Sequence, residues 1–189
     1  MSELTNLIQE DCAAYSPVKF SVTHIRLRDI VNRWMKTPGF RVTCTMRVCK
    51  YLEHKRVYRL FYWLCKYVYR RQQIKYGIQI GHRLTVGGGF RIDHYGGIVI
   101  GESAVLGKNL TIRQNVTIGT AHDGTPIVGD NTDIGAGAIL IGGITIGDDC
   151  VIGAGAVVTR SFPDKSVIAG VPAKLLRKNI YKRIANETK

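Results

Sequence analysis

The sequence predicts a parallel β-helix preceded by a short helical segment. Aliphatic residues recur every six positions through the second half of the chain, and the next residue is usually Gly. The repeated aliphatic position is filled by Ile100, Leu106, Ile112, Ile118, Val128, Ile134, Leu140, Ile146, Ile152 and Val158. Each hexad predicts one short strand with an inward aliphatic side chain and a corner where Gly lets the chain turn. Three hexads close a coil, and stacked coils share a core that no single coil has alone.

The chain divides into three predicted parts, which together suit one domain with an appendage in 189 residues. These are a helical segment (1–73), the β-helix (74–168) and a basic, weakly helical tail (169–189). Apolar residues at helical spacing predict four helices in the first part. Their expected spans are 2–14, 24–35, 38–52 and 54–73. Pro38 suits the first turn of the third helix because its missing N–H has no partner to lose there.

The fourth predicted helix is apolar on more than one side. One face carries aliphatic and Phe side chains, and much of the rest is Tyr or Trp. That face consists of Val57, Leu60, Phe61, Leu64 and Val68. The apolar run is too short, and too interrupted by Arg59 and Lys66, to span a bilayer. Packing against sister subunits is the favoured interpretation, and a position in the membrane interface is the alternative.

Two breaks interrupt the six-residue rhythm. Ile118 and Val128 are ten residues apart rather than six, so the chain between them is expected to leave the solenoid as a loop. A second break lies at 93–97, where the hexads move two residues out of register. Loops on a rigid scaffold commonly carry function.

Charge and cysteine content narrow the partners and the compartment. The chain has 27 Lys and Arg against 14 Asp and Glu, a formal charge of +13, which attracts anionic partners. No nucleic-acid-binding motif is present, so nucleic acid is not expected as a partner. Five cysteines without a CxxC pair are typical of free thiols in a reducing compartment. The polar N-terminus shows no secretion signal, so we expect a cytoplasmic protein, with peripheral contact at the inner membrane face as an extension.

Several motifs occur together in a recognisable order. They are IDHYGGIVIGE (92–102), NVTIG (115–119), IGAGA (134–138 and 152–156) and AGVPAK (169–174). This combination resembles the serine acetyltransferase family of left-handed β-helix acyltransferases, most of all its short members associated with capsular and surface polysaccharides. Since TPGFRVTCTMRV echoes the family's last helices, the likeness covers about 37–178. It implies a left-handed solenoid, a homotrimer, acetyl-CoA as co-substrate and no metal.

The resemblance also implies a catalytic centre. His94 holds the place of the family's general base, which accepts the proton of the acceptor hydroxyl, and Asp93 is expected to orient the acceptor or His94. A surface histidine in a turn is the structural alternative. Gln79 stands where the family has an Asp that orients the imidazole. Residues expected to meet the acceptor are Gln79, Tyr95, His122 and Asp123, the last two from a neighbouring subunit unless they form a solvent-exposed loop tip.

The resemblance also implies a binding site for acetyl-CoA. The family lays the pantetheine arm along small residues, which here are Gly119, Thr120, Ala136 and Ala154. The structural alternative is that these small residues only make tight corners. Cations are expected to meet the phosphates of coenzyme A. The candidates for that role are Lys174, Arg177 and Lys178.

The acceptor prediction rests on missing charges. The family's Arg-His pair for the serine carboxylate falls on Gly124 and Thr125, and the Asp for its amine falls on His24, although Asp93 could still serve the amine. Leaving either charged group of serine unpaired in a closed site is unfavourable. We therefore predict a sugar hydroxyl of a surface polysaccharide or its precursor as acceptor, with serine O-acetylation, as in cysteine biosynthesis, as the alternative.

Two other classes of function compete with the transferase. Parallel β-helices also support zinc-dependent carbonic anhydrase chemistry, which needs three converging imidazoles. His82, His94 and His122 are available, but their spacing scatters them over the coil faces. The other rival is a non-catalytic trimeric scaffold, which the intact IDHYGG motif disfavours.

Overall fold

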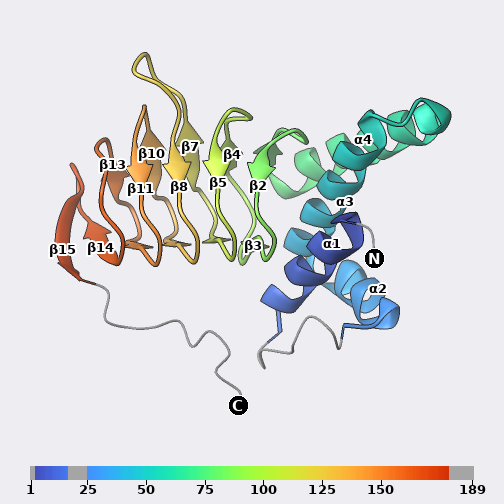
Figure 1. Cartoon of the computed structure of the whole chain (residues 1–189), viewed down its shortest axis with the longest axis horizontal. Coiled ribbons are helices and arrows are strands. Elements are labelled where there is room, and N and C mark those ends of the chain that lie inside the picture. The colour runs from blue at the N-terminus through green and yellow to red at the C-terminus, as the bar shows by residue number, and fades with distance from the viewer. Residues whose placement is uncertain (1–2, 17–24, 179–189) are drawn as a thin grey trace.

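The computed structural model consists of a solenoid with a group of helices at one end (Figure 1). The structure describes residues 3–16 and 25–178. Ser2, His24 and the tail beyond residue 178, each part of a prediction above, lie outside these ranges.

All four predicted helices are present. They are α1 (Glu3–Ala14), α2 (Leu27–Lys36), α3 (Pro38–Glu53) and α4 (Arg59–Tyr76), with a short 3-10 turn, η2 (Arg56–Tyr58), before α4. Pro38 occupies the first turn of α3, as expected. The last helix starts later than predicted because His54 and Lys55 form the bend after α3. It also ends later than predicted, at Tyr76. Gly77 ends α4 in the left-handed conformation, with φ of 61°, which costs Gly little.

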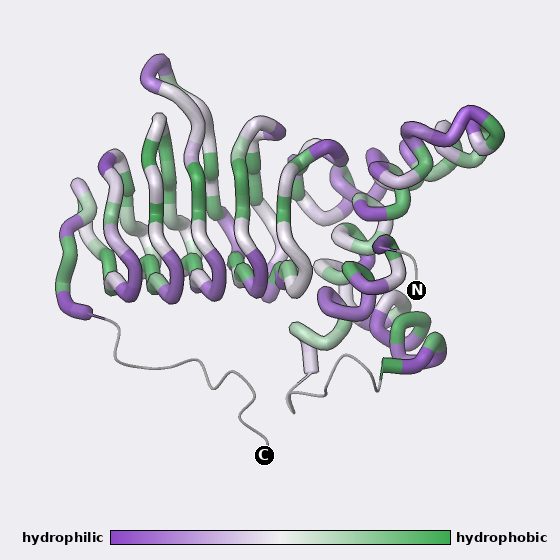
Figure 2. Tube along the Cα trace, viewed as in Figure 1, coloured by the Kyte–Doolittle hydropathy of each residue, from purple (hydrophilic) through white to green (hydrophobic). Residues whose placement is uncertain are grey.

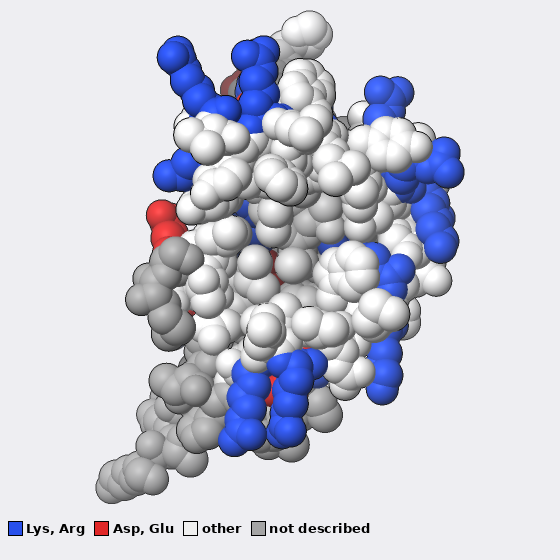
Figure 3. Space-filling view, turned by 90° about the vertical axis from the view of Figure 1, so that its right-hand side faces the viewer, with Lys and Arg blue, Asp and Glu red and all other residues white. Residues whose placement is uncertain are grey.

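The aliphatic face of α4 is not the face that packs within the chain. Val57, Leu60, Phe61, Leu64 and Val68 are 38–89% exposed. The buried positions of α4 are Tyr69, Gln72 and Tyr76, which lie on the adjoining side of the helix. Figure 3 shows this end of the molecule, where Lys and Arg gather around an uncharged middle. Among the helices described, none combines the length and apolar character needed to cross a membrane.

The solenoid is built from three sheets, and all their strands from β1 to β14 pair in parallel, which confirms the predicted fold class. One sheet has the order β1-β4-β7-β10-β13, and a second has β11-β8-β5-β2. The third has β15-β14-β12-β9-β6-β3. The first coil holds β1 (Ile78–Ile80), β2 (Thr85–Val86) and β3 (Arg91–Ile92); the second holds β4 (Ile98–Ile100), β5 (Val105–Leu106) and β6 (Thr111–Ile112). The third holds β7 (Thr117–Gly119), β8 (Ile127–Val128) and β9 (Asp133–Ile134); the fourth holds β10 (Ile139–Ile141), β11 (Thr145–Ile146) and β12 (Val151–Ile152). The last strands that the structure describes are β13 (Val157–Val158), β14 (Ser166–Ala169) and β15 (Lys174–Lys178).

The aliphatic hexad positions form one continuous core. All ten repeated residues from Ile100 to Val158 are buried, and they stack coil upon coil. Figure 2 shows apolar and polar stretches recurring in the same order along the coils. Burial of this kind is the main stabilising contribution, about 25 cal/mol per Å² of apolar surface.

Both predicted breaks in the rhythm are visible in the strand register. Ile78 pairs with Ile98, whereas Val99 pairs with Thr117, so the coil containing 93–97 is two residues longer than the next. The loop after β7 stands out from the coils in Figure 1. Its tip is closed by paired backbone hydrogen bonds between Ala121 and Gly124, of 3.0 and 3.1 Å.

The beginning of the tail is a strand, so the prediction of weak helicity there is wrong. β15 pairs antiparallel with β14, with Ala169 opposite Lys174. Gly170, with φ of 99°, and Pro172 reverse the chain between the two strands. The unpaired edge of β14 offers backbone partners to this segment, and helix propensity alone did not reveal them.

A buried ion pair joins the helices to the first coil. Arg47 on α3 is 4% exposed and Asp11 on α1 is 0% exposed. Their side chains meet through Arg47 Nε and Asp11 Oδ2 at 3.0 Å. Arg47 also donates to the backbone carbonyls of Val86 and Gly87, and Asp11 accepts from the N–H of Phe90. One pair of side chains therefore fixes two helices against the corner after β2.

All five cysteines are free; three are buried and two are half-buried. Burial raises the pKa of the Cys44 thiol to about 12. Because only the thiolate reacts, we expect iodoacetamide at pH 8 to label Cys44 roughly 1,000-fold more slowly than a thiol of ordinary pKa. Its rate should rise about tenfold per pH unit up to that pKa. Peptide mass spectrometry measures the rate, with the chain unfolded in guanidinium as control; equal rates folded and unfolded would refute the prediction.

Candidate functional site

One corner of the solenoid repeats the same turn in successive coils. It connects the third sheet to the first, and the second residue after each strand occupies the middle of the turn. These residues are His94, Gln114, Ala136 and Ala154, after β3, β6, β9 and β12. Backbone hydrogen bonds link the last three coil to coil: Gly137 N–H donates to the Gln114 carbonyl and Gly155 N–H to that of Ala136. In the first turn the two extra residues shift this pattern, and Asn115 N–H donates to the Gly96 carbonyl instead of that of His94. We call this row the corner column.

His94 stands at the helical end of the corner column, in the longer coil. Its side chain is exposed, and it makes no hydrogen bond or ion pair with any residue of 3–16 or 25–178 that the structure records. Gly96 and Gly97 follow it, both with positive φ, of 110° and 64°. These glycines let the chain take up the two extra residues before β4 begins. The register break therefore turns the imidazole out of the aliphatic stack, where a substrate can reach it.

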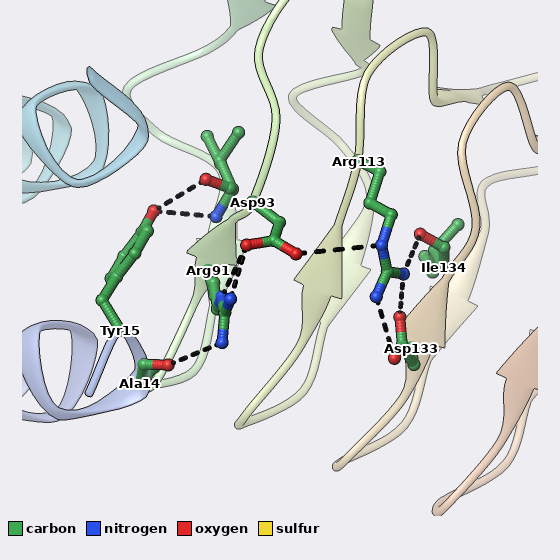
Figure 4. A network of polar contacts seen from close by, with 8 residues as sticks. Ala14, Tyr15, Arg91, Asp93, Arg113, Asp133 and Ile134 are labelled. Carbon is green, nitrogen blue, oxygen red and sulfur yellow. Dashed lines mark hydrogen bonds and ion pairs between the residues drawn. The ribbon is translucent and has the colours of Figure 1, made fainter. Parts of the chain in front are cut away.

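Asp93 belongs to a network of charges on the third sheet rather than to His94 (Figure 4). Its Oδ1 accepts a hydrogen bond from Arg91 Nε at 3.1 Å, and its Oδ2 lies 3.9 Å from Arg113 Nε. Arg113 also forms an ion pair with Asp133, one coil further on. The hydrogen bond to Asp133 raises the pKa of Arg113, so this guanidinium stays charged. The described contacts of Asp93 do not include the imidazole.

The same network is tied to the helices. Arg91 donates to the carbonyl of Ala14, at the end of α1, over 3.3 Å. The hydroxyl of Tyr15 donates to the Ile92 carbonyl and accepts from the Ile92 N–H. α1 thus fixes the strand that leads into the Asp93-His94 turn, and the conformation of that turn depends on helix packing.

Tyr95 and Gln79 flank the His94 corner. The ring of Tyr95 contacts that of Tyr76, at the end of α4, edge to face with centroids 5.3 Å apart. Gln79 is the outward-facing middle residue of β1 and pairs in register with Val99. No hydrogen bond joins Gln79 to His94 in the part of the chain that the structure describes. Its predicted role beside the imidazole stays a prediction.

The remaining acceptor candidates lie on a different corner. Gly119 ends β7, Thr120 follows it, and His122 and Asp123 are exposed at the loop tip. The Thr120 hydroxyl lies 3.1 Å from that of Ser103 in the coil before. His94 precedes the first-sheet strand β4, whereas this loop follows the first-sheet strand β7. Within one chain, the two groups therefore lie at opposite ends of that sheet's strands.

The predicted cofactor residues are divided between the same two corners. Ala136 and Ala154 lie in the corner column with His94, whereas Gly119 and Thr120 lie on the corner with the loop. The three basic candidates, Lys174, Arg177 and Lys178, are exposed on β15, at the far end of the third sheet. From β3 to β14 there are four strand spacings, about 19 Å at ~4.8 Å each. The corner column thus runs from the imidazole toward the basic strand.

The histidines considered for zinc do not converge. His82 contacts the hydroxyl of Tyr62 at 3.3 Å and Glu53 Oε2 at 3.5 Å, on the helical side. His94 and His122 lie on two other corners. In the described ranges, no group of three His, Cys, Asp or Glu side chains is placed to hold a metal ion.

Comparisons with known proteins agree on one family. Residues 127–160 match a family model described as the hexapeptide repeat of succinyl-transferase. Serine acetyltransferase from Buchnera aphidicola is 32% identical over 161 residues, covering 80% of this chain and 60% of that protein. The solved structure of soybean serine acetyltransferase is 30% identical with a TM-score of 0.73, covering 92% of this chain and 69% of that one. The chain belongs to the serine acetyltransferase family. It has that family's left-handed β-helix fold.

Membership of the serine acetyltransferase family corrects the acceptor prediction. A sugar of a surface polysaccharide is wrong as the acceptor, because the similar proteins are serine acetyltransferases. One of them, from Neisseria gonorrhoeae, was solved in complex with serine and has 28% identity, a TM-score of 0.72 and coverage of 93% of this chain and 69% of that one. The prediction rested on the missing charges at Gly124, Thr125 and His24. Missing charges at three positions do not exclude recognition of serine by other residues. The chain spans about three fifths of the length of the serine acetyltransferases from Buchnera aphidicola and Bacillus subtilis.

Two features of this serine acetyltransferase homologue were missed in the sequence. Arg91 and Arg113 place two guanidiniums beside Asp93. Both lie at strand ends, where the sequence alone does not distinguish them from ordinary surface charges. Gln114 follows β6 in the turn position that Ala136 and Ala154 hold in the next two coils, which is visible once the strands are in register. The available signal was the contrast between RQN (113–115) and the two later GAG turns (135–137 and 153–155).

Proposed function

We propose that this protein is a serine O-acetyltransferase that moves an acetyl group from acetyl-CoA to the hydroxyl of L-serine. The observation that carries the proposal is the corner column, which begins at His94 and continues through Ala136 and Ala154. His94 is exposed and has no polar partner among the described residues. The likeness to serine acetyltransferases supports it. A general base at one end of a row of small side chains is what acyl transfer from a long thioester requires.

The reaction proceeds by direct attack. The serine hydroxyl oxygen bonds to the thioester carbonyl carbon while its proton passes to an imidazole nitrogen of His94. The carbonyl oxygen takes up negative charge in the tetrahedral intermediate. When the intermediate collapses, the C–S bond breaks, and the proton returns from His94 to the departing thiolate of coenzyme A. An imidazole suits both transfers, because the neutral ring accepts the hydroxyl proton and the imidazolium so formed donates it to the thiolate.

The pantetheine arm lies along the corner column in this proposal. Ala136 and Ala154 leave backbone groups accessible there, because a methyl side chain does not cover them. The arm leads toward β15, where Lys174, Arg177 and Lys178 place positive charge near the phosphates. The +13 formal charge of the chain also favours an anionic co-substrate.

A homotrimer completes the site in this proposal. His94 and the His122-Asp123 loop tip lie on separate corners of one chain, so they meet across a groove between neighbouring solenoids. The exposed aliphatic face of α4 gives neighbouring copies apolar surface to bury. Light scattering at micromolar concentration should give three times the chain mass of 21.0 kDa. A monomer would contradict the assembly.

Steady-state kinetics with L-serine test the activity. We expect saturable, serine-dependent release of coenzyme A, followed as free thiol, and O-acetylserine in the product mixture. L-alanine is the matched control, because it has the same carboxylate and amine but no hydroxyl, and it should give no release above hydrolysis. Equal thiol release with serine, with alanine and with no acceptor would refute the serine proposal.

A further inference from the structure

The corner column contains a second polar side chain besides His94. Gln114 is the second residue after β6, in the turn between the longer His94 turn and the turns of the two alanines. Asn115 N–H beside it donates to the carbonyl of Gly96 in the His94 turn. Adjacent strands in the column are ~4.8 Å apart, so a Gln side chain reaches the space beside either neighbour. In the proposed function, this is where the thioester carbonyl must lie, since His94 must reach the attacking hydroxyl and the arm continues along Ala136.

The side-chain amide of Gln114 is oriented by the fold. The residue is half-buried, and its Oε1 is buried without a hydrogen-bond partner among the described residues. The amide nitrogen is not among the buried unpaired atoms, and no hydrogen bond of it within residues 3–16 and 25–178 is recorded. With the oxygen turned inward, the N–H groups are left to face outward along the corner.

The turn itself does not require glutamine. Ala136 and Ala154 take the same position in the next two coils, followed by Gly in each case. An unpaired buried carbonyl oxygen is unfavourable by about 1–3 kcal/mol, so Gln114 stabilises the corner less than alanine would. A residue that is unfavourable for folding and placed beside a catalytic base points to a role in the reaction.

We infer that Gln114 donates a hydrogen bond from Nε2 to the thioester carbonyl oxygen and stabilises the negative charge that develops on it. This inference rests on the proposed transferase function. The amide forms no covalent bond and loses no proton; the hydroxyl proton still goes to His94 and then to the leaving thiolate. Fixed donors aimed at a developing oxyanion are among the largest contributions to enzymatic rates.

Kinetics of three variants test this role. Gln114→Ala removes the donor and should lower kcat about 100-fold, with KM for acetyl-CoA and for serine within about threefold of the parent. Gln114→Glu has nearly the same shape but carries negative charge toward the oxyanion, so it should lose at least as much. Lys108→Ala is the matched control: Lys108 holds the same place before a positive-φ Asn in the neighbouring turn of the same coil. It should keep parental kcat.

The outcomes separate a catalytic role from a structural one. Loss in both Gln114 variants, with unchanged circular dichroism and with Lys108→Ala unaffected, supports the donor. Near-parental kcat in Gln114→Ala, or normal kcat in the isosteric Gln114→Glu, would overturn it. If the parent protein releases no thiol in response to serine, the proposed function fails by itself. The slow hydrolysis of acetyl-CoA, which forms the same oxyanion, then tests Gln114 with the same three variants.

Discussion

His94→Ala is expected to reduce serine-dependent acetyl transfer by ~10²–10⁴-fold, the usual contribution of a general base. Without the imidazole, the attacking hydroxyl must lose its proton to water. The loss should appear in kcat, because in the proposed function acetyl-CoA is held mainly by the turns of Ala136 and Ala154 and by the basic strand β15. The solenoid should stay folded, since His94 is exposed and takes no part in the aliphatic stack.

Steady-state kinetics and far-UV circular dichroism on the same preparation measure both properties. His54→Ala is the matched control, because His54 is also exposed but lies at the bend after α3, away from the corner column. It should keep parental activity. If a folded His94→Ala protein turned over at nearly the parental rate, the general-base mechanism would have to be abandoned.

Arg47→Ala should lower the free energy of unfolding by about 3–5 kcal/mol, because it leaves the Asp11 carboxylate buried and unpaired. It also removes the donor to the Val86 and Gly87 carbonyls. Asp11→Asn with Arg47→Met should recover part of the loss, because no buried charge then remains.

Urea unfolding measures these differences. Arg70→Ala changes an exposed arginine on α4 and should alter stability by less than about 0.5 kcal/mol. A midpoint for Arg47→Ala within error of the Arg70→Ala value would mean that the buried pair does not fasten the helices to the first coil. Because α1 also holds Arg91 and Ile92, Arg47→Ala should in addition lower activity more than stability alone explains.

The solenoid was predictable because one physical rule repeats through it. Each hexad places an aliphatic residue inward, and every one from Ile100 to Val158 is buried as expected. The register break at 93–97 was also visible, since inserting two residues shifts a period of six. These features depend on local spacing, which a single sequence contains.

The partners of individual polar side chains were not predictable in the same way. Arg47 lies in a helix with mixed sequence, and its buried contact with Asp11 joins residues 36 positions apart. Asp93 was expected near the imidazole, but its described contacts are with Arg91 and Arg113, which strand register brings to the same face. The open face of α4 had a strong apolar pattern, but a pattern does not say which side meets its own chain.

The two ends of the solenoid are closed by different means, and this bears on whether the protein can polymerise. A stack of parallel strands has an open edge at each end, on which another copy can add its own strands. At the start, α3 approaches the first coil so closely that a Cβ on Gly39 would lie 2.2 Å from the Ile92 carbonyl. At the finish, β15 runs antiparallel to β14, so the terminal edge of the third sheet has the wrong direction for continuing a parallel ladder. Fibre growth by end-to-end stacking is therefore blocked by helices at one end and disfavoured at the other by a reversed strand.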